Sequence, residues 1–480
     1  MSTQVRHETE PSGAHPAPVA EAEFLRLFPD YRQTRILDEL RRTDFARLER
    51  LGQIYLDYTG GGLYAESQVR RHMELLVGRV FGNPHSANPT SLATTELIER
   101  CRRRVLDYFN ASPDEYAVIF TANASNALKL VGESYPFRPG DRFLLTFDNH
   151  NSVNGLREFD RAHGAETTYV PVIPPEMRVD DAHMDEHLAT ACKGSNNLFA
   201  YPAQSNFSGV QHPLEWIERA QKHGWDVLLD AAAFVPTNRL DLSRYRPDYV
   251  ALSFYKMFGY PTGVGALIAR WPALGKLHRP WFAGGTIEVA SVQADTHSFA
   301  AGSAAFEDGT LDYTNIPAVE LGLDFLESVG IETIHTRVRC LTGWLVRQLL
   351  ALRHANGRPL VSLYGPAGTD RRGGAVALNF LTEEGRLIDH QEVERRAAER
   401  QISLRTGCFC NPGAGEMALG LSRDEIVACF DRQPERTMTY EEFRGCIDEK
   451  GTGAVRVSIG PVTTFRDVSA FLDFANEFRR

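Results

Sequence analysis

Short apolar runs alternate with amphipathic helical patterns through most of this chain, and this alternation constrains the fold more than any other feature. The strand-like runs between about residues 117 and 254 are AVIFTA, RFLLTF, NLFAYPA, DVLLDAA and DYVALSF. Segments such as ASNALKLVGESY and LEWIERAQKHG separate them and have helical spacing. This rhythm predicts an α/β fold with a mostly parallel central sheet covered by helices.

A different pattern follows in the C-terminal third. A long helical stretch from about Ile316 to Ala355 precedes the segments GAVALNFL, EVERRAAERQISLRTG and AVRVSIG, which predict a smaller C-terminal α+β domain. At 480 residues the chain exceeds one typical core. We therefore expect a large domain over residues 21–330 and a small domain over 331–480, with residues 21–60 packing partly on the small domain. Residues 1–20 have almost no large apolar side chains and are expected to form a disordered tail.

Charge and composition exclude several classes of partner. The 52 basic and 62 acidic residues give a net charge of −10 without a basic block, so we expect no nucleic-acid partner. The N-terminus lacks a secretory pattern and no stretch approaches a bilayer span, which predicts a cytoplasmic protein without membrane contact.

Seven thinly spread cysteines predict free thiols. Only Cys408 and Cys410 are close neighbours, and without a second such pair we expect no metal site.

Asp230 and Lys256 follow two successive predicted strands. Asp230 ends the run DVLLD, at the strand end where open α/β sheets bind ligands, although taken alone it also suits a helix cap. Lys256 follows DYVALSF, and its neighbours Tyr255 and Met257 are unusual around a solvated surface lysine. A desolvated lysine forms a Schiff base with an aldehyde, and a carboxylate keeps a pyridine nitrogen protonated. Together they predict a site for pyridoxal 5′-phosphate (PLP).

A third element, FTANASNAL, is a strand that runs into small polar residues before a helix. Amides at a helix N-terminus bind anions, so Asn123, Ala124 and Ser125 are candidates for holding a phosphate. Simple N-capping by Asn123 or Ser125 explains the same pattern.

Nine ordered segments, from about residue 50 to the C-terminus, carry a family resemblance. They are YLDYTGGGLY, FTANASNALKL, DNHNSVNGLRE, PAQSNFSGV, LLDAAAFVPT, SFYKMFGYPTGVGAL, FEDGTLDY, LRTGCFCNPGAGE and VRVSIG. The chain resembles the class V aminotransferase and cysteine desulfurase family of fold-type I PLP enzymes, and within it the N-terminal sulfurase domain of molybdenum cofactor sulfurases. The resemblance implies a large domain with a mostly parallel sheet, a smaller C-terminal α+β domain and a homodimer.

The resemblance also implies roles at the cofactor. Lys256 would carry PLP and shuttle protons, Asp230 would pair with the pyridine nitrogen, His150 would stack on the ring, and Asn206 would bond the ring hydroxyl. The residues implied to hold the phosphate are Asn123, Ala124, Ser125, Ser253, Tyr255 and, from the partner subunit, Thr310. Tyr255 stands where simpler relatives have His, and Ala233 replaces a polar residue three positions after Asp230.

Three further residues are implied to act on the substrate. Arg405 would bind the substrate carboxylate, for which guanidinium geometry is suited, although an isolated arginine also suits a surface salt bridge. Thr59 is expected beside it. Cys410 would lie on a mobile loop and attack the substrate sulfur as a thiolate, becoming a persulfide. A structural buried cysteine is the alternative.

These residues predict a PLP-dependent cysteine desulfurase-like enzyme that acts on L-cysteine or a related thio-amino acid and passes sulfur to the molybdenum cofactor or another acceptor. Two other functions remain open. One is a PLP-dependent C–S lyase, epimerase or aminotransferase-like enzyme on another amino acid, in which Cys408 and Cys410 only shape the pocket. The other is a non-catalytic scaffold or sulfur-relay partner. The presence of Lys256, Asp230, His150 and Arg405 together argues against it, because a scaffold has no need for all four.

Overall fold

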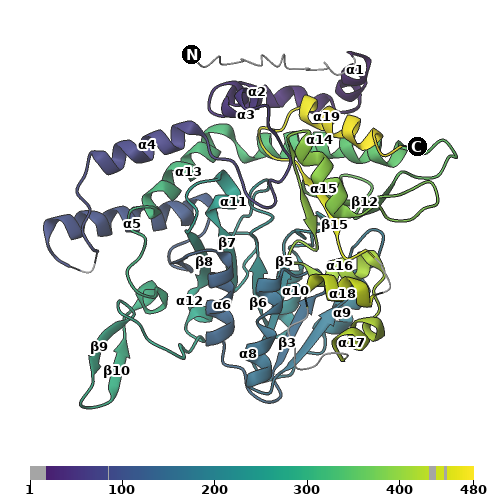
Figure 1. Ribbon diagram of the computed structural model, residues 1–480. Coiled ribbons are helices and arrows are strands. Elements are labelled where there is room, and N and C mark those ends of the chain that lie inside the picture. The colour runs from purple at the N-terminus through teal and green to yellow at the C-terminus, as the bar shows by residue number, and fades with distance from the viewer. Residues whose placement is uncertain (1–17, 85, 432–438, 448–450, 480) are drawn as a thin grey trace, which may run out of the picture.

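The largest sheet of this computed structural model lies between helices (Figure 1). The structure describes residues 18–84, 86–431, 439–447 and 451–479. Within them this sheet has seven strands in the order β2-β8-β7-β6-β5-β3-β4. Neighbours from β7 to β4 are parallel, whereas β8 is antiparallel to β2 and β7, which confirms the predicted mostly parallel sheet. The strands are β2 (Tyr116–Thr121), β3 (Arg142–Thr146), β4 (Glu166–Val170), β5 (Asn197–Pro202), β6 (Trp225–Asp230), β7 (Tyr249–Ser253) and β8 (Gly265–Arg270).

Both faces of the inner part of this sheet are buried, which is why its inner strands are almost continuously apolar; the edge strand β4, with the sequence ETTYV, is buried only at Val170. On β7, Tyr249 and Ala251 join one hydrophobic cluster, while Val250 and Leu252 join another on the opposite face. The helices that follow or cover these strands are α5 (Pro89–Tyr108), α6 (Ala124–Ser134), α7 (Asn151–Asn154), α8 (Arg157–Ala162), α9 (Asp181–Leu188), α10 (Trp216–His223), α11 (Phe254–Phe258), α12 (Trp271–Leu274) and α13 (Ile316–Val329).

A second, antiparallel sheet has the order β11-β12-β15-β14. Its strands are β11 (Val361–Tyr364), β12 (Ala375–Phe380), β14 (Arg405–Gly407) and β15 (Ala454–Ser458). The helices of this C-terminal part are α14 (Ile331–Ala351), α15 (His390–Glu399), α16 (Pro412–Leu419), α17 (Arg423–Asp431), α18 (Tyr440–Cys446) and α19 (Phe465–Asn476). The domain boundary at residue 330 stays a prediction.

The N-terminal segment lies against this C-terminal part. Strand β1 (Ile54–Tyr55) pairs in parallel with β13 (Ile402–Ser403). The buried Arg41 forms an ion pair with Asp467, at 3.2 Å. The other elements of this segment are α1 (Pro18–Leu27), η1 (Pro29–Thr34), α2 (Arg35–Arg42) and α3 (Arg47–Arg50). Helix α4 (Glu66–Val77), which follows the segment, packs against α13.

Three expectations from the sequence need correction. The predicted long helix is two helices, α13 and α14, because Gly330 between them adopts φ +84°, which a helix interior does not allow. Helix α1 begins at Pro18, so the predicted tail was wrong for residues 18–20; residues 1–17 lie outside those described. Cys429 and Cys446 are disulfide-bonded rather than free, because α17 and α18 bring their Cα atoms to 5.7 Å.

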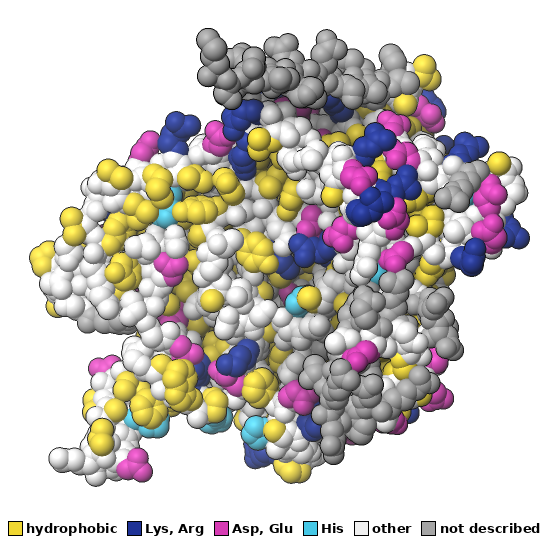
Figure 2. Space-filling model, viewed as in Figure 1, with side chains coloured by type: hydrophobic (Ala, Val, Ile, Leu, Met, Phe, Trp, Pro, Cys, Tyr) yellow, Lys and Arg dark blue, Asp and Glu magenta, His cyan; other side chains and the backbone are white. Residues whose placement is uncertain are grey.

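Two parts of the chain project from the body of the protein (Figure 1). One is a hairpin of β9 (Ile287–Ser291) and β10 (Thr296–Phe299), which is followed in the chain by η2 (Gly302–Phe306); the other is the end of α4. Hydrophobic side chains are exposed on both, as Figure 2 shows. They include Val77 at the end of α4, Val80 just after it, and Val289 and Val292 in the hairpin. Among the helices described, none is long and apolar enough to cross a membrane.

Candidate active site

Lys256 lies on a single helical turn, α11, directly after the buried strand β7. The turn ends at Gly259, where φ is +79° and a Cβ would lie 2.2 Å from the Tyr64 amide nitrogen. Burial lowers the pKa of the Lys256 ammonium, while the Asp230 carboxylate opposes that shift. The fold therefore holds an amine with an increased neutral fraction at the edge of the sheet.

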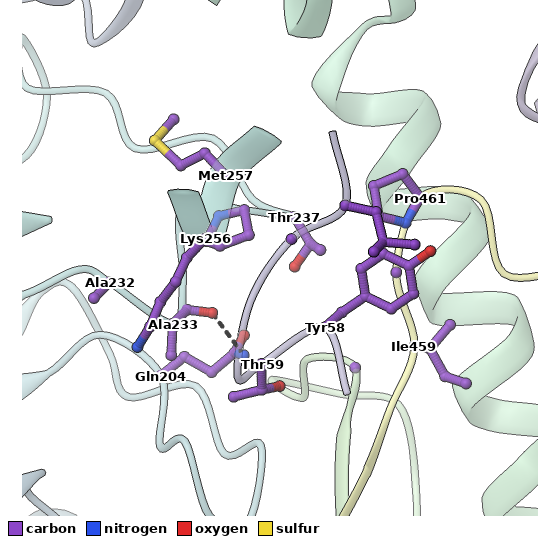
Figure 3. A pocket seen from close by; sticks show the side chains of 15 residues that line it. Tyr58, Thr59, Gln204, Ala232, Ala233, Thr237, Lys256, Met257, Ile459 and Pro461 are labelled. Atoms are coloured by element: carbon purple, nitrogen blue, oxygen red, sulfur yellow. Dashed lines mark hydrogen bonds between the residues drawn. The ribbon is translucent and has the colours of Figure 1, made fainter. Parts of the chain in front are cut away.

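A small cavity of about 30 Å³ adjoins Lys256 and is lined in part by Thr59 and Gln204. Figure 3 shows the Lys256 side chain extending toward Ala233 and Gln204. Gln204 Nε2 donates a 2.9 Å hydrogen bond to the Ala233 carbonyl. Since Ala233 has no polar side chain, its backbone supplies the polar contact at this position.

Asp230 and His150 lie near Lys256, because strand ends of a parallel sheet meet at one edge. Asp230 ends β6, is 8% exposed, and its Oδ1 accepts a hydrogen bond from the Ala232 amide at 3.0 Å. His150 caps α7, and its Nδ1 accepts from the Ser152 amide at 3.1 Å. Burial lowers the pKa of His150, the Asp230 carboxylate raises it, and Lys256 lowers it. The three groups therefore form one electrostatic unit.

The N-terminus of α6 forms a polar cradle beside this unit. Asn123 caps the helix by accepting from the Asn126 amide at 3.0 Å, and Ser253 Oγ accepts from the Ala124 amide at 2.8 Å. Ser125 Oγ lies 2.6 Å from Ser152 Oγ. Four of the six residues predicted to hold the phosphate, namely Asn123, Ala124, Ser125 and Ser253, are thus brought together.

Tyr255 and Thr310 lie on other sides of the site. The Tyr255 ring packs near Gly61, and burial raises the pKa of its hydroxyl, with Arg405 opposing the shift. The charge of Arg405 therefore acts on the Tyr255 hydroxyl. Thr310 is exposed and lines a hollow of about 310 Å³ together with Thr121 and Asn126. Their predicted contacts with a phosphate stay predictions.

Cys410 is exposed on a short turn between β14 and α16. Phe409 and Cys410 both have positive φ, +56° and +54°, which is strained for residues with side chains. The Asn206 side-chain amide donates to the Phe409 carbonyl at 2.7 Å, and the Asn151 amide donates to the Cys410 carbonyl at 2.7 Å. Asn206, predicted to bond the cofactor, thus also holds the cysteine turn.

Asn411 anchors the other end of this turn and was not identified from the sequence. It is completely buried, and its Nδ2 donates to the Asp148 carbonyl at 2.7 Å and to Asn206 Oδ1 at 2.9 Å. Its Oδ1 accepts from the Ala414 amide at 3.2 Å. These contacts fix the backbone of the turn and argue against a long excursion of Cys410; the mobility expected from the sequence stays a prediction.

Arg405 is half exposed and is bonded to Asp57, at 2.9 Å from Nε and 2.7 Å from Nη2. Asp57 also accepts from the buried Arg456, at 3.0 Å. Asp57 and Arg456 belong to the segments YLDYTGGGLY and VRVSIG, but the sequence alone assigned them no role. The pKa of Lys256 is affected by the charges of Arg405, Arg456 and the thiolate form of Cys410, as well as by that of Asp230.

This donor set fits PLP. A partly buried lysine of lowered pKa suits the aldehyde, a carboxylate at a strand end suits the pyridine nitrogen, and a helix N-terminus flanked by hydroxyls suits the phosphate. Among the residues described, no group of three His, Cys, Asp or Glu side chains is arranged to hold a metal ion.

Comparison with known proteins agrees with this geometry. A profile of the family described as aminotransferase class-V matches residues 54–471. Molybdenum cofactor sulfurases are similar: that of Arabidopsis thaliana is 37% identical over 94% of this chain and 60% of its own length, and that of Homo sapiens is 36% identical over 92% and 51%. The chain thus spans about half to three fifths of these relatives.

Solved structures share the fold. A cysteine desulfurase from Thermococcus onnurineus NA1 aligns with a TM-score of 0.74 at 22% identity, covering 92% of this chain and 97% of its own. The cystine C–S lyase C-DES, in complex with its product cysteine persulfide, aligns with a TM-score of 0.67 at 19% identity, covering 89% and 98%.

Proposed function

The chain belongs to the class-V aminotransferase family, and on that premise we propose that it is a PLP-dependent enzyme that removes sulfur from L-cysteine or a related thio-amino acid through a Cys410 persulfide. The observation that carries this proposal is the attachment of the Cys410 turn. Its backbone is bonded to Asn151, next to His150, and to Asn206. The Cys410 side chain is exposed, and the negative charge of its thiolate form would raise the pKa of Lys256.

Each residue around the pocket would have a separate role. When bound, PLP withdraws electrons from the substrate and weakens the bonds around its Cα. Asp230 would keep a pyridine nitrogen protonated, and the cradle at α6 would hold a phosphate. Lys256 Nζ, whose pKa is lowered by burial, would take up and return protons at the substrate carbons. Arg405 would orient the substrate carboxylate.

Sulfur transfer follows at Cys410. The Cys410 thiolate attacks the substrate sulfur, so that a sulfur–sulfur bond forms while the bond between that sulfur and the substrate Cβ breaks. The electron pair of the broken bond stays with the carbon fragment, which is protonated and leaves as alanine. Cys410 then carries the sulfur as a persulfide at the exposed face of the pocket.

The persulfide requires an acceptor. Since the relatives that match are molybdenum cofactor sulfurases, we propose the molybdenum cofactor as one acceptor class and another sulfur carrier as the alternative. We also propose a cytoplasmic homodimer. Exposed apolar side chains on α4 and the β9–β10 hairpin support the dimer, because a partner subunit would cover them; Val77 is 88% and Val292 98% exposed. In that dimer Thr310 would face the partner's cradle.

Turnover of L-cysteine by purified holoenzyme tests the mechanism. Cys410→Ala should abolish persulfide and strongly reduce sulfur release, while the visible absorbance of the bound cofactor persists. Cys192→Ala changes a free cysteine that contacts Arg142 and Asn197 at the starts of β3 and β5, and it serves as the matched control. Undiminished turnover in Cys410→Ala would refute the persulfide route and favour direct C–S lysis.

A further inference from the structure

Asp57 joins two arginines, Arg405 and Arg456, whose charges act on the pKa of Lys256. It follows β1 and is 7% exposed. Its Oδ2 accepts from Nε and Nη2 of Arg405, and its Oδ1 accepts from Nη2 of Arg456. One carboxylate therefore sets the spacing of two guanidinium groups, which come from β14 and β15.

The two arginines are not equivalent. Arg456 is buried, donates from Nη1 to the Asn206 carbonyl at 2.9 Å, and lies 4.7 Å from the centre of the Phe409 ring. Arg405 keeps half of its side chain exposed. Its bonds to Asp57 use only the Nε–Nη2 edge of the guanidinium, and no other described residue bonds Nη1. Because a guanidinium is a planar fork of five N–H donors, the Nη1–Nη2 end of Arg405 can bind a second carboxylate.

Room for this arrangement depends on two glycines. A Cβ on Gly60 would lie 2.5 Å from Asp57 Oδ2 and 2.8 Å from Arg405 Nη2. A Cβ on Gly62 would lie 2.9 Å from the Lys256 carbonyl. The turn from Asp57 to Gly62 therefore ties the arginine pair to the helix that carries the lysine.

We propose that Asp57 is a positioning residue that makes the pocket selective for amino acids with a free carboxylate, and that Gly60 provides the space for it. The inference deepens the proposed function and rests on it, since it takes an amino acid as the ligand. Two guanidinium groups and one carboxylate leave one uncompensated positive charge, which one substrate carboxylate neutralises. Without Asp57, Arg405 loses the contact that orients its free end toward the substrate.

Binding of L-alanine and of L-alaninamide to the holoenzyme, followed by absorbance titration, tests this proposal. The two ligands differ only in the carboxylate. Asp57→Asn keeps the size of the side chain and removes its charge, and we expect it to weaken L-alanine binding about tenfold, which corresponds to ~1.4 kcal/mol. Binding of L-alaninamide should stay within about twofold of the wild-type value, since no orienting contact to its neutral amide is lost.

Arg405→Gln should abolish the preference for L-alanine, and Asp57→Asn should then have no further effect, because residues that act through one contact are not additive. Gly60→Ala retains every charge and should also lower the preference, which keeps the test decisive if Asp57→Asn does not fold. Gly368→Ala is the matched control, because a Cβ there meets no atom within 4 Å.

Equal weakening of both ligands in Asp57→Asn and Gly60→Ala would assign Asp57 a structural role and overturn the proposal. An unchanged preference would overturn it too, as would tighter L-alanine binding, which would make Asp57 a competitor of the substrate. The titration requires no sulfur transfer. Failure of the Cys410 persulfide therefore leaves the ligand preference measurable, and the two proposals fail separately.

Discussion

Replacing Asn411 with alanine should release the turn that carries Cys410. The side chain is completely buried and makes three hydrogen bonds, to the Asp148 carbonyl, the Asn206 side chain and the Ala414 amide. Each buried partner left unsatisfied costs about 1–3 kcal/mol, and partial rehydration of the turn recovers some of this. We expect the free energy of local opening to fall by about 3 kcal/mol, which accelerates amide exchange about a hundredfold.

Hydrogen exchange of the segment 408–415 in the holoenzyme measures this effect. Asn411→Asp isolates the donor: it retains an acceptor for the Ala414 amide but turns a carboxylate toward two oxygens, so it should be at least as damaging at neutral pH. Asn88→Ala removes an exposed helix cap on α5 and should leave exchange in this segment unchanged. Wild-type exchange rates in a folded Asn411→Ala protein would refute the reasoning.

Three further predictions concern the lysine pocket. Burial lowers the pKa of His150, so at acidic pH the unfolded chain binds more protons than the folded protein, and stability is lost as the pH falls below about 6.5. His150→Gln should therefore reduce the dependence of the melting temperature on pH over that acidic range. Asp230 raises the pKa of Lys256, so Asp230→Asn should move the pH midpoint for the rate of PLP attachment to apoprotein, followed by absorbance, to a lower value. Gly259→Ala imposes a clash with a backbone nitrogen and a left-handed conformation, and should lower the melting temperature by several degrees or prevent folding.

The fold was largely predictable from local patterns. The inner strands of the parallel region, β3, β5, β6 and β7, are apolar runs with little exposure, so their pattern carries the signal directly. The edge strand β4, with the sequence ETTYV, is buried only at Val170 and was not among the predicted runs. The break at Gly330 was harder to identify, since glycine is tolerated within helical patterns and the helices on both sides, α13 and α14, have similar apolar spacing. The disulfide between Cys429 and Cys446 depends on how two short helices meet, which spacing does not determine.

The candidate site was predictable where chemistry follows directly after a strand. Asp230, Lys256 and Ser253 end or follow predicted strands, and the structure brings them to one edge. Asp57 and Arg456 could not be inferred in this way. They are 399 residues apart in the chain, and their contact is made only when the N-terminal segment packs on the C-terminal sheet. The signal that was present for both is a charged residue within an otherwise uncharged motif, YLDYTGGGLY for Asp57 and VRVSIG for Arg456.

A single turnover with limiting L-cysteine tests the central claim most directly. The holoenzyme is mixed with substrate, quenched, and analysed for small products and for the mass of each cysteine-containing peptide. The account predicts one alanine per sulfur removed and a mass gain of one sulfur atom on the peptide that contains Cys410. Pyruvate and ammonia without such a gain, or sulfur on a different cysteine, would contradict it.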